Sequence, residues 1–220
     1  MLKHIILNYS IMLISIGGLI GAGKSTVLDI LKETLESDNF IFLNEPVDEW
    51  QSIKDSNGVN ALQHFYNDPK KYAMSFQILA FITRLVQLQE ALETYDELEP
   101  VIITERSLEE DRFIFAEHLH ETGLISDIDF KIYEYWFNSQ KILPDLQFFL
   151  KASPDKCLDR IIKRGRPEER EMDLRYLEAL EKRYTGMIGR SSTPVYLIDA
   201  EHRTPNEVAE EIVKYILLNI

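Results

Sequence analysis

The chain has 220 residues, of which 45% are hydrophobic and 28% are charged, and it carries a formal net charge of -13. This length and composition are typical of a globular protein with a sizeable core. The acidic balance excludes an extended nucleic-acid groove, because binding a phosphate backbone requires a basic surface.

The single cysteine, Cys157, excludes an internal disulfide framework. It lies in an apolar helical pattern, so we expect a buried thiol with a structural role. Residues 1–12 lack the pattern of a signal peptide, and no apolar run of about 18 residues follows them. We therefore expect a cytoplasmic protein with no membrane span.

Short apolar runs alternate with longer amphipathic stretches along the chain. The predicted strands are residues 12–16, 40–44, 100–104, 145–150 and 195–198. The predicted helices are residues 24–36, 58–66, 69–96, 107–121, 126–140, 154–164, 173–189 and 205–217. Strands that are apolar throughout predict a parallel sheet covered by helices on both faces. The fold class is therefore α/β, with a five-stranded parallel sheet flanked by helices, in one domain that spans residues 1–220.

A glycine-rich loop with the pattern G-x-x-x-x-G-K-S follows the first predicted strand and precedes a helix. This order predicts a P-loop that binds a nucleoside triphosphate, because backbone N–H groups and the helix N-terminus attract phosphate oxygens. Lys24 can reach the β- and γ-phosphates, and the hydroxyl of Ser25 can bind Mg²⁺. The residues expected around the triphosphate are Gly18, Leu19, Ile20, Gly21, Ala22, Gly23, Lys24, Ser25 and Thr26.

The segment after the second predicted strand begins with Glu45, Pro46 and Val47, and Trp50 follows. Ligands of parallel sheets bind beyond the carboxyl ends of the strands, so Glu45 is expected in the same crevice as the P-loop. A carboxylate there can accept the proton of a substrate hydroxyl that attacks a phosphoryl group. The alternative is a solvated loop carboxylate, and Trp50 more often packs than stacks on a ligand.

Glu105 and Arg106 follow the third predicted strand and open a helix that contains Asp111 and Phe115. Arg106 can stabilise charge on a transferred phosphoryl group, and Glu105 can help to hold Mg²⁺. Asp111 and Phe115 share a helix face, where they can hydrogen-bond a base and cover its ring. The alternatives are surface ion pairs and a charged cap above a core phenylalanine.

The long predicted helix 69–96 carries Gln77, Ala80 and Arg84 on one stripe. A polar, a small and a basic side chain within an apolar stripe are unusual for a plain core. Glutamine offers the donor and acceptor that match the edge of a nucleobase, although this pattern is weak by itself.

A basic cluster that includes Arg164 and Arg166 surrounds Gly165 between two predicted helices, at about residues 164–170. A break of this kind predicts a mobile lid whose arginines close over the phosphates and stabilise transition-state charge. A solvated run of charges is the alternative.

Together these segments resemble the deoxyribonucleoside kinases over nearly the full length of the chain. The matching segments are Gly18–Thr26, Glu45-Pro46-Val47 with Trp50, Phe76-Gln77, Glu105-Arg106-Ser107, and Arg164-Gly165-Arg166 with Glu168-Glu169. The resemblance implies an enzyme that transfers the γ-phosphoryl group of ATP to the 5′-hydroxyl of a deoxyribonucleoside, with Mg²⁺. It also implies a homodimer that packs through helices.

The same resemblance implies roles for individual residues in catalysis. Glu45 would be the general base for the 5′-hydroxyl, and Arg106 would bind near that hydroxyl. Glu105 and Ser25 would support Mg²⁺, and Lys24 with the loop amides would grip the triphosphate.

Further roles concern the nucleoside and the lid. Tyr66 and Glu169 would hold the sugar 3′-hydroxyl, Gln77 would read the base edge, and Phe76 and Phe115 would enclose the ring. Arg164 and Arg166 would be the lid arginines. The full set expected around the nucleoside is Glu45, Trp50, Tyr66, Phe76, Gln77, Ala80, Arg84, Arg106, Asp111, Phe115 and Glu169.

At Ala80, Arg84 and Asp111 the chain resembles the branch of deoxycytidine and deoxyguanosine kinases. An Arg–Asp pair suits an amino-bearing or purine base, so we expect deoxycytidine, deoxyadenosine or deoxyguanosine rather than thymidine. The chain departs from the usual pattern at Gly17, where an acidic residue is common, and at Leu19, where Asn is frequent.

Two other functions remain open at this stage. A nucleoside monophosphate kinase of the thymidylate type shares the P-loop and lid, but it needs further cations for the acceptor phosphate. A non-catalytic accessory subunit is expected to lose the catalytic residues, whereas Lys24, Glu45 and Arg106 are all present.

Overall fold

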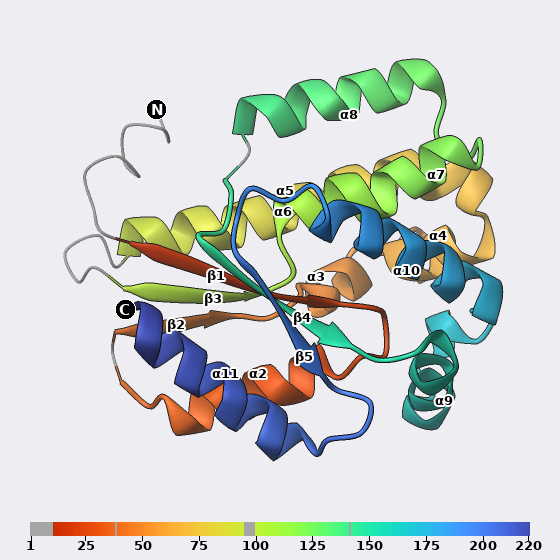
Figure 1. Ribbon diagram of the computed structural model, residues 1–220. Coiled ribbons are helices and arrows are strands. Elements are labelled where there is room, and N and C mark those ends of the chain that lie inside the picture. The colour runs from red at the N-terminus through yellow and green to blue at the C-terminus, as the bar shows by residue number, and fades with distance from the viewer. Residues whose placement is uncertain (1–10, 38, 95–99, 141) are drawn as a thin grey trace.

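The computed structural model describes residues 11–37, 39–94, 100–140 and 142–220. Its centre is a sheet of five parallel strands in the order β2-β3-β1-β4-β5 (Figure 1). The strands are β1 (Met12–Gly18), β2 (Phe40–Leu43), β3 (Val101–Glu105), β4 (Leu146–Lys151) and β5 (Val195–Asp199). Each lies within two residues of a predicted strand, which confirms the five-stranded parallel sheet.

Helices cover both faces of this sheet, as Figure 1 shows. They are α2 (Lys24–Thr34), α3 (Val47–Ser52), α4 (Ala61–Asn67), α5 (Pro69–Thr94), α6 (Leu108–Glu110), α7 (Glu117–Glu121), α8 (Asp127–Gln140), α9 (Pro154–Arg164), α10 (Leu174–Ile188) and α11 (Pro205–Asn219). Two short turns complete the set, the π-helical η1 (Asp111–Ala116) and the 3-10 helical η2 (Pro167–Glu169).

The alternation of side chains along β1 explains the two layers. Ile14 and Ile16 are fully buried in a core that they share with residues of α2 and α11. Leu13 points to the other face, where it belongs to a cluster with Leu88 and Leu92 of α5. Burial on both faces is why the strand is apolar throughout.

Three helix predictions differ from the structure. Helix α3 was not expected, because six residues are too few to show a helical period. Helix α4 begins at residue 61 rather than 58, since the side chain of Asn60 accepts the N–H of Gln63 and caps the helix there. The predicted helix 107–121 is interrupted by η1, and residues 95 and 96 of the predicted helix 69–96 lie outside the described residues.

Because all strands are parallel, their carboxyl ends meet at one edge of the sheet. The segments after β1, β2, β3 and β5 contribute to one cavity at this edge, and residues of α9 and η2 line it as well. Among the described residues, we find no helix that is both long and apolar enough to cross a lipid bilayer.

Candidate active site

The loop between β1 and α2 closes tightly against α9. A Cβ atom on Gly21 would lie 2.4 Å from the carbonyl oxygen of Cys157, and Gly21 has a φ of +82°. Only glycine fits this position, so Gly21 is required by the close approach of α9 to the loop. Residues 20–27 of the loop and the first turn of α2 line the cavity.

Lys24 is buried at the start of α2. Its ammonium donates to the carbonyl of Leu19 (Nζ–O 2.9 Å) and lies 3.9 Å from Oε1 of Glu105. The pKa of Lys24 is lowered from 10.5 to about 8, first by burial and then by the charge of Arg106, against the opposing charges of Glu105 and Glu45. An anionic ligand near the ammonium would restore its charged form.

Ser25 and Glu105 offer a set of oxygen ligands beside the loop. The hydroxyl of Ser25 donates to Oε1 of Glu105 at 3.2 Å, and Glu105 is buried at the end of β3. Mg²⁺ prefers oxygen ligands and is commonly held by one or two carboxylates together with phosphates and water. These two side chains therefore fit a magnesium ion beside bound phosphates.

Glu45 lies at the carboxyl end of β2 and contacts two arginines. Its Oε1 accepts a hydrogen bond from Nε of Arg106 at 2.9 Å and lies 3.5 Å from Nη2 of Arg84. Burial opposes ionisation, but the charges of Arg106, Arg84 and Lys24 lower the pKa of Glu45 from 4.5 to about 2. The carboxylate is therefore ionised at neutral pH and able to accept a proton.

The backbone of Arg106 directs this side chain into the cavity. Arg106 has a φ of 68°, which is in the region that favours glycine. Its N–H donates to the carbonyl of Ile16 at 3.0 Å, and its own carbonyl accepts from the hydroxyl of Thr104 at 2.6 Å. The guanidinium lies 4.9 Å from the ring centroid of Phe115, which is a favourable cation–π contact.

Arg84 and Asp111 form a buried ion pair. Nε of Arg84 donates to Oδ2 of Asp111 at 2.9 Å, and Nη1 donates to the backbone carbonyl of Glu105 at 2.5 Å. Asp111 lines the large cavity, whereas Arg84 borders a much smaller neighbouring one. Arg84 therefore holds Asp111 and contacts Glu45 from behind the cavity wall.

The far end of the cavity is lined by aromatic side chains. The ring of Phe76 stacks on Phe65 with centroids 4.7 Å apart and meets the edge of Trp50 at 5.2 Å. The indole N–H of Trp50 donates to the hydroxyl of Thr83 at 3.0 Å, which fixes the ring. Gln77 also lines this region, and its Oε1 is buried without a hydrogen-bond partner among the described residues. An apolar slot with one free amide acceptor suits a flat polar ring.

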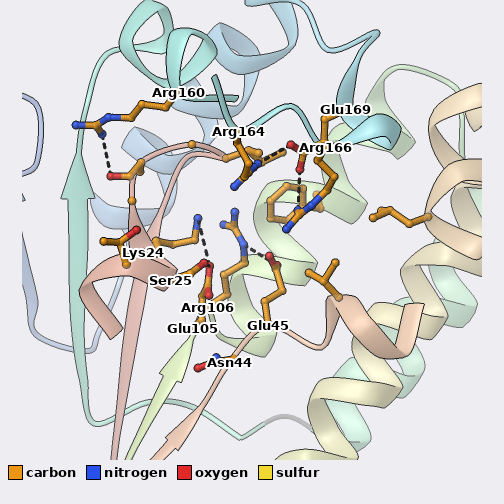
Figure 2. Close-up of a pocket in the computed structure, with 18 of the residues that line it drawn as sticks. Lys24, Ser25, Asn44, Glu45, Glu105, Arg106, Arg160, Arg164, Arg166 and Glu169 are labelled. Carbon is orange, nitrogen blue, oxygen red and sulfur yellow. Dashed lines mark hydrogen bonds and ion pairs between the residues drawn. The ribbon is translucent and has the colours of Figure 1, made fainter. Parts of the chain in front are cut away.

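The predicted lid faces the P-loop across the cavity (Figure 2). Arg164 and Arg166 both donate to the carboxylate of Glu169, at 2.6 and 2.9 Å. Glu169 lines the cavity, whereas Glu168 points to α3 and α4. The geometry thus separates the two neighbouring glutamates into one that faces the cavity and one that anchors the lid.

The cavity has a volume of about 840 Å³ and is lined by all but three of the predicted site residues. The exceptions are Gly18, Leu19 and Arg84. Gly18 and Leu19 present their carbonyl groups to Arg106 and Lys24, so they shape the loop from its inner side. Tyr66 and Ala80 lie in the wall as expected, and burial raises the pKa of Tyr66 well above 10, so this phenol stays protonated.

Sequence reasoning missed several lining residues. They are Asn44, Asp48, Phe65, Tyr176 and Arg203. Arg160 and Lys163 belong to the basic run that the sequence offered as a lid, and both line the cavity from α9. Arg160 donates to the carbonyl of Ala22 in the P-loop (3.0 Å) and to that of Ala200 after β5 (2.7 Å).

The structure gives a physical reason for the glycine at position 17. A Cβ atom on Gly17 would lie 2.6 Å from Oε1 of Glu110, which is buried on α6. A side chain at position 17 and the present position of this carboxylate are therefore mutually exclusive. Leu19, the other departure, is buried in the core and does not line the cavity.

Comparisons with known proteins agree with this geometry. A family model described as deoxynucleoside kinase matches residues 14–219. Deoxycytidine kinase of Bos taurus is 36% identical over 191 residues, which cover 78% of this chain and 73% of the relative. The mitochondrial deoxyguanosine kinase of Xenopus laevis is 30% identical over 224 residues, with 89% and 84% covered. The solved structure of deoxyadenosine kinase from M. mycoides, with the products dCMP and a flexible dCDP bound, superposes with a TM-score of 0.78. It is 29% identical, and the match covers 94% of this chain and 99% of that one.

Proposed function

The chain belongs to the deoxynucleoside kinase family and is an ATP-dependent nucleoside kinase, and on this premise we propose its acceptor and the roles of its residues. The acceptor is the 5′-hydroxyl of deoxycytidine, deoxyadenosine or deoxyguanosine in preference to thymidine. The γ-phosphoryl group of ATP is transferred to it.

One observation carries the proposal: a single cavity joins the P-loop to an aromatic slot, with Glu45 and Arg106 between them. A triphosphate at one end and a nucleoside at the other would bring the γ-phosphorus to the 5′-oxygen near these two side chains. A monophosphate acceptor would carry its own phosphate at that same point, beside Glu45. The ionised carboxylate of Glu45 would repel a phosphate, which favours an uncharged nucleoside.

In the proposed reaction Glu45 accepts the proton of the 5′-hydroxyl. The 5′-oxygen forms a bond to the γ-phosphorus, the bond to the β–γ bridging oxygen breaks, and ADP leaves. The low pKa of Glu45 fits a loose transition state, in which the hydroxyl gives up its proton late. Lys24 and Arg106 stabilise charge on the phosphoryl oxygens, so most of the rate enhancement comes from positioning and electrostatics.

We assign Ser25 and Glu105 to Mg²⁺, which when bound neutralises charge on the phosphates. The P-loop residues bind the triphosphate. Residues 164–170 act as the lid of a single domain, and Arg164 and Arg166 turn from Glu169 to the phosphates when ATP is present. Both arginines line the cavity and pair with Glu169 there, which supports this role.

The nucleoside binds at the aromatic end. Tyr66 and Glu169 hold the 3′-hydroxyl, because both line the cavity on the lid side. The unpaired Oε1 of Gln77 accepts from the base, and Phe76 and Phe115 enclose the ring. Trp50 and Ala80 complete the wall of this pocket.

Base preference is assigned to Asp111, which Arg84 holds in place. A carboxylate accepts from an exocyclic amine, which cytosine, adenine and guanine carry and thymine lacks. The relatives described above are named for deoxycytidine, deoxyguanosine and deoxyadenosine, which supports the same preference.

We also propose a homodimer that packs through α5 and α8, which lie on the same side of the sheet in Figure 1. Large apolar side chains on both helices are exposed, which is unusual for a surface that stays in water. They are Ile82, Val86, Ile128, Ile132, Tyr135 and Trp136.

The test is a phosphorylation assay with ATP and Mg²⁺ against the four deoxynucleosides, the ribonucleosides and thymidine monophosphate. We expect product from deoxycytidine or a deoxypurine nucleoside and little from thymidine. Thymidine as the fastest acceptor would overturn the role of Asp111, and product from thymidine monophosphate alone would indicate a monophosphate kinase.

A further inference from the structure

The buried guanidinium of Arg106 is held on two sides by carboxylates. Glu45 binds Nε at 2.9 Å and faces the cavity. On the opposite side Nη1 lies 3.1 Å from Oε2 of Glu110, and Glu110 does not line the cavity. The second carboxylate thus has no direct access to a ligand, yet it contacts a residue that does.

Glu110 belongs to a closed cluster of hydrogen bonds. The phenol of Tyr184 donates to Oε2 of Glu110 at 2.6 Å and accepts from Nη1 of Arg106 at 2.6 Å. The carbonyl of Gly18 accepts from the same Nη1 at 2.9 Å. Nη1 is therefore fully engaged by protein groups, whereas Nη2 makes no hydrogen bond with the residues that the structure describes.

We propose that Glu110 is a positioning residue for catalysis: with Tyr184 it holds one edge of Arg106 so that Nη2 points to the reacting phosphoryl group. This proposal rests on the role proposed above for Arg106. The physical reason for the proposal is that Glu45 loses its negative charge when it accepts the proton. Its interaction with Arg106 then becomes weaker. Glu110 is outside the cavity and takes no part in the proton transfer, so its contacts with Arg106 and Tyr184 keep Arg106 oriented through the transfer.

Gly17 provides the room for this arrangement. Its missing side chain leaves space for the carboxylate of Glu110, which a Cβ atom would meet at 2.6 Å. The strained backbone of Arg106 agrees with the same view, since such strain persists only where several contacts determine the conformation.

The test is a double-mutant cycle with E110Q and R106K in the full-length chain. Glutamine keeps the volume of Glu110 and removes its charge. Lysine keeps the charge of Arg106 and removes the planar set of N–H donors that contacts Glu110 and Tyr184. In the wild-type background E110Q should lower kcat about 10- to 100-fold, with a change in nucleoside KM below about threefold. In the R106K background E110Q should lower kcat by less than about threefold more, because Nη1 of Arg106, the partner of Glu110, is already absent.

The neighbouring carboxylate offers a matched control. Glu109 lies on the same helix and binds Gln147 outside the cavity, so E109Q should leave kcat unchanged. Unchanged kcat in E110Q, or an equal loss in both backgrounds, would overturn the proposal. Should E110Q fail to fold, Tyr184→Phe replaces it, with an expected loss of about 3- to 10-fold that also disappears beside R106K.

The cycle separates this inference from the proposed function. An inactive wild-type chain would overturn the function itself. Active wild type with slow R106K and normal E110Q would overturn only the role of Glu110.

Discussion

Replacing Glu45 with glutamine removes the proposed base and keeps the shape of the side chain. The amide can still accept hydrogen bonds from Arg106 and from the 5′-hydroxyl, but it cannot take up the proton. We expect turnover to fall roughly 10²- to 10⁴-fold, which is the usual contribution of a positioned general base.

The structure also sets an upper bound on how far E45Q lowers the free energy of unfolding. The pKa of Glu45 is lowered from 4.5 to about 2, which corresponds to about 3 kcal/mol in favour of the charged form. Arg106 and Arg84 keep Glu110 and Asp111 as partners, so E45Q should lose no more than this amount and remain folded. Because the folded pKa is depressed, this stabilisation is present above about pH 4.5 and is lost as the pH falls toward 2.

The assay is steady-state phosphorylation of deoxycytidine, together with the free energy of unfolding measured in urea. Glu49 supplies a matched control, since it is an exposed carboxylate on α3 that does not line the cavity. E49Q should therefore keep wild-type turnover. Turnover of E45Q within a few-fold of wild type would refute the role of Glu45. A rise of wild-type kcat with an apparent pKa near 6 that is absent in E45Q would refute its low pKa.

Three further predictions concern other parts of the site. Above pH 8 the affinity for ATP should fall by up to about tenfold per pH unit, because Lys24 has a pKa of about 8 and must bind a proton before it can pair with the phosphates. Calorimetry of ATP binding at pH 8.5 in two buffers should show proton uptake, and binding without proton uptake would contradict the prediction. Glu168→Ala should raise nucleoside KM about 3- to 10-fold and spare kcat, since Glu168 accepts from Gln51 and Asn60 and holds the lid; an unchanged KM would exclude this anchor. Trp136→Glu should dissociate the dimer in sedimentation experiments, whereas a monomeric wild type would contradict the proposed interface.

The parts of the fold that sequence predicted correctly are those with a local cause. The strands are apolar runs between turn residues, and the P-loop is a contiguous pattern of glycines followed by Lys24 and Ser25. The residues at the strand ends converge as predicted, because parallel strands share one edge. The cytoplasmic location and the homodimer stay predictions.

The parts that sequence did not predict depend on tertiary contacts. Glu110 follows another glutamate and no motif of the sequence singles it out, yet it is only 1% exposed. It is buried because Gly17 leaves space for it and Tyr184, 74 residues further along, supplies a donor. The positive φ of Arg106 accompanies a long-range hydrogen bond to Ile16, so no local sequence pattern predicts it.

The placement of Arg84 links base recognition to chemistry. Its guanidinium binds Asp111, to which we assign the nucleobase, and it lies 3.5 Å from Glu45, to which we assign the 5′-hydroxyl. Arg84 also lowers the pKa of Glu45. A substitution of Asp111 that frees Arg84 would therefore change the charge around Glu45, the proposed general base, as well as the choice of nucleoside. With the proposed roles, nucleoside choice and turnover depend on the same buried arginine, so a change of acceptor by mutation of Asp111 alone should be accompanied by a change in kcat.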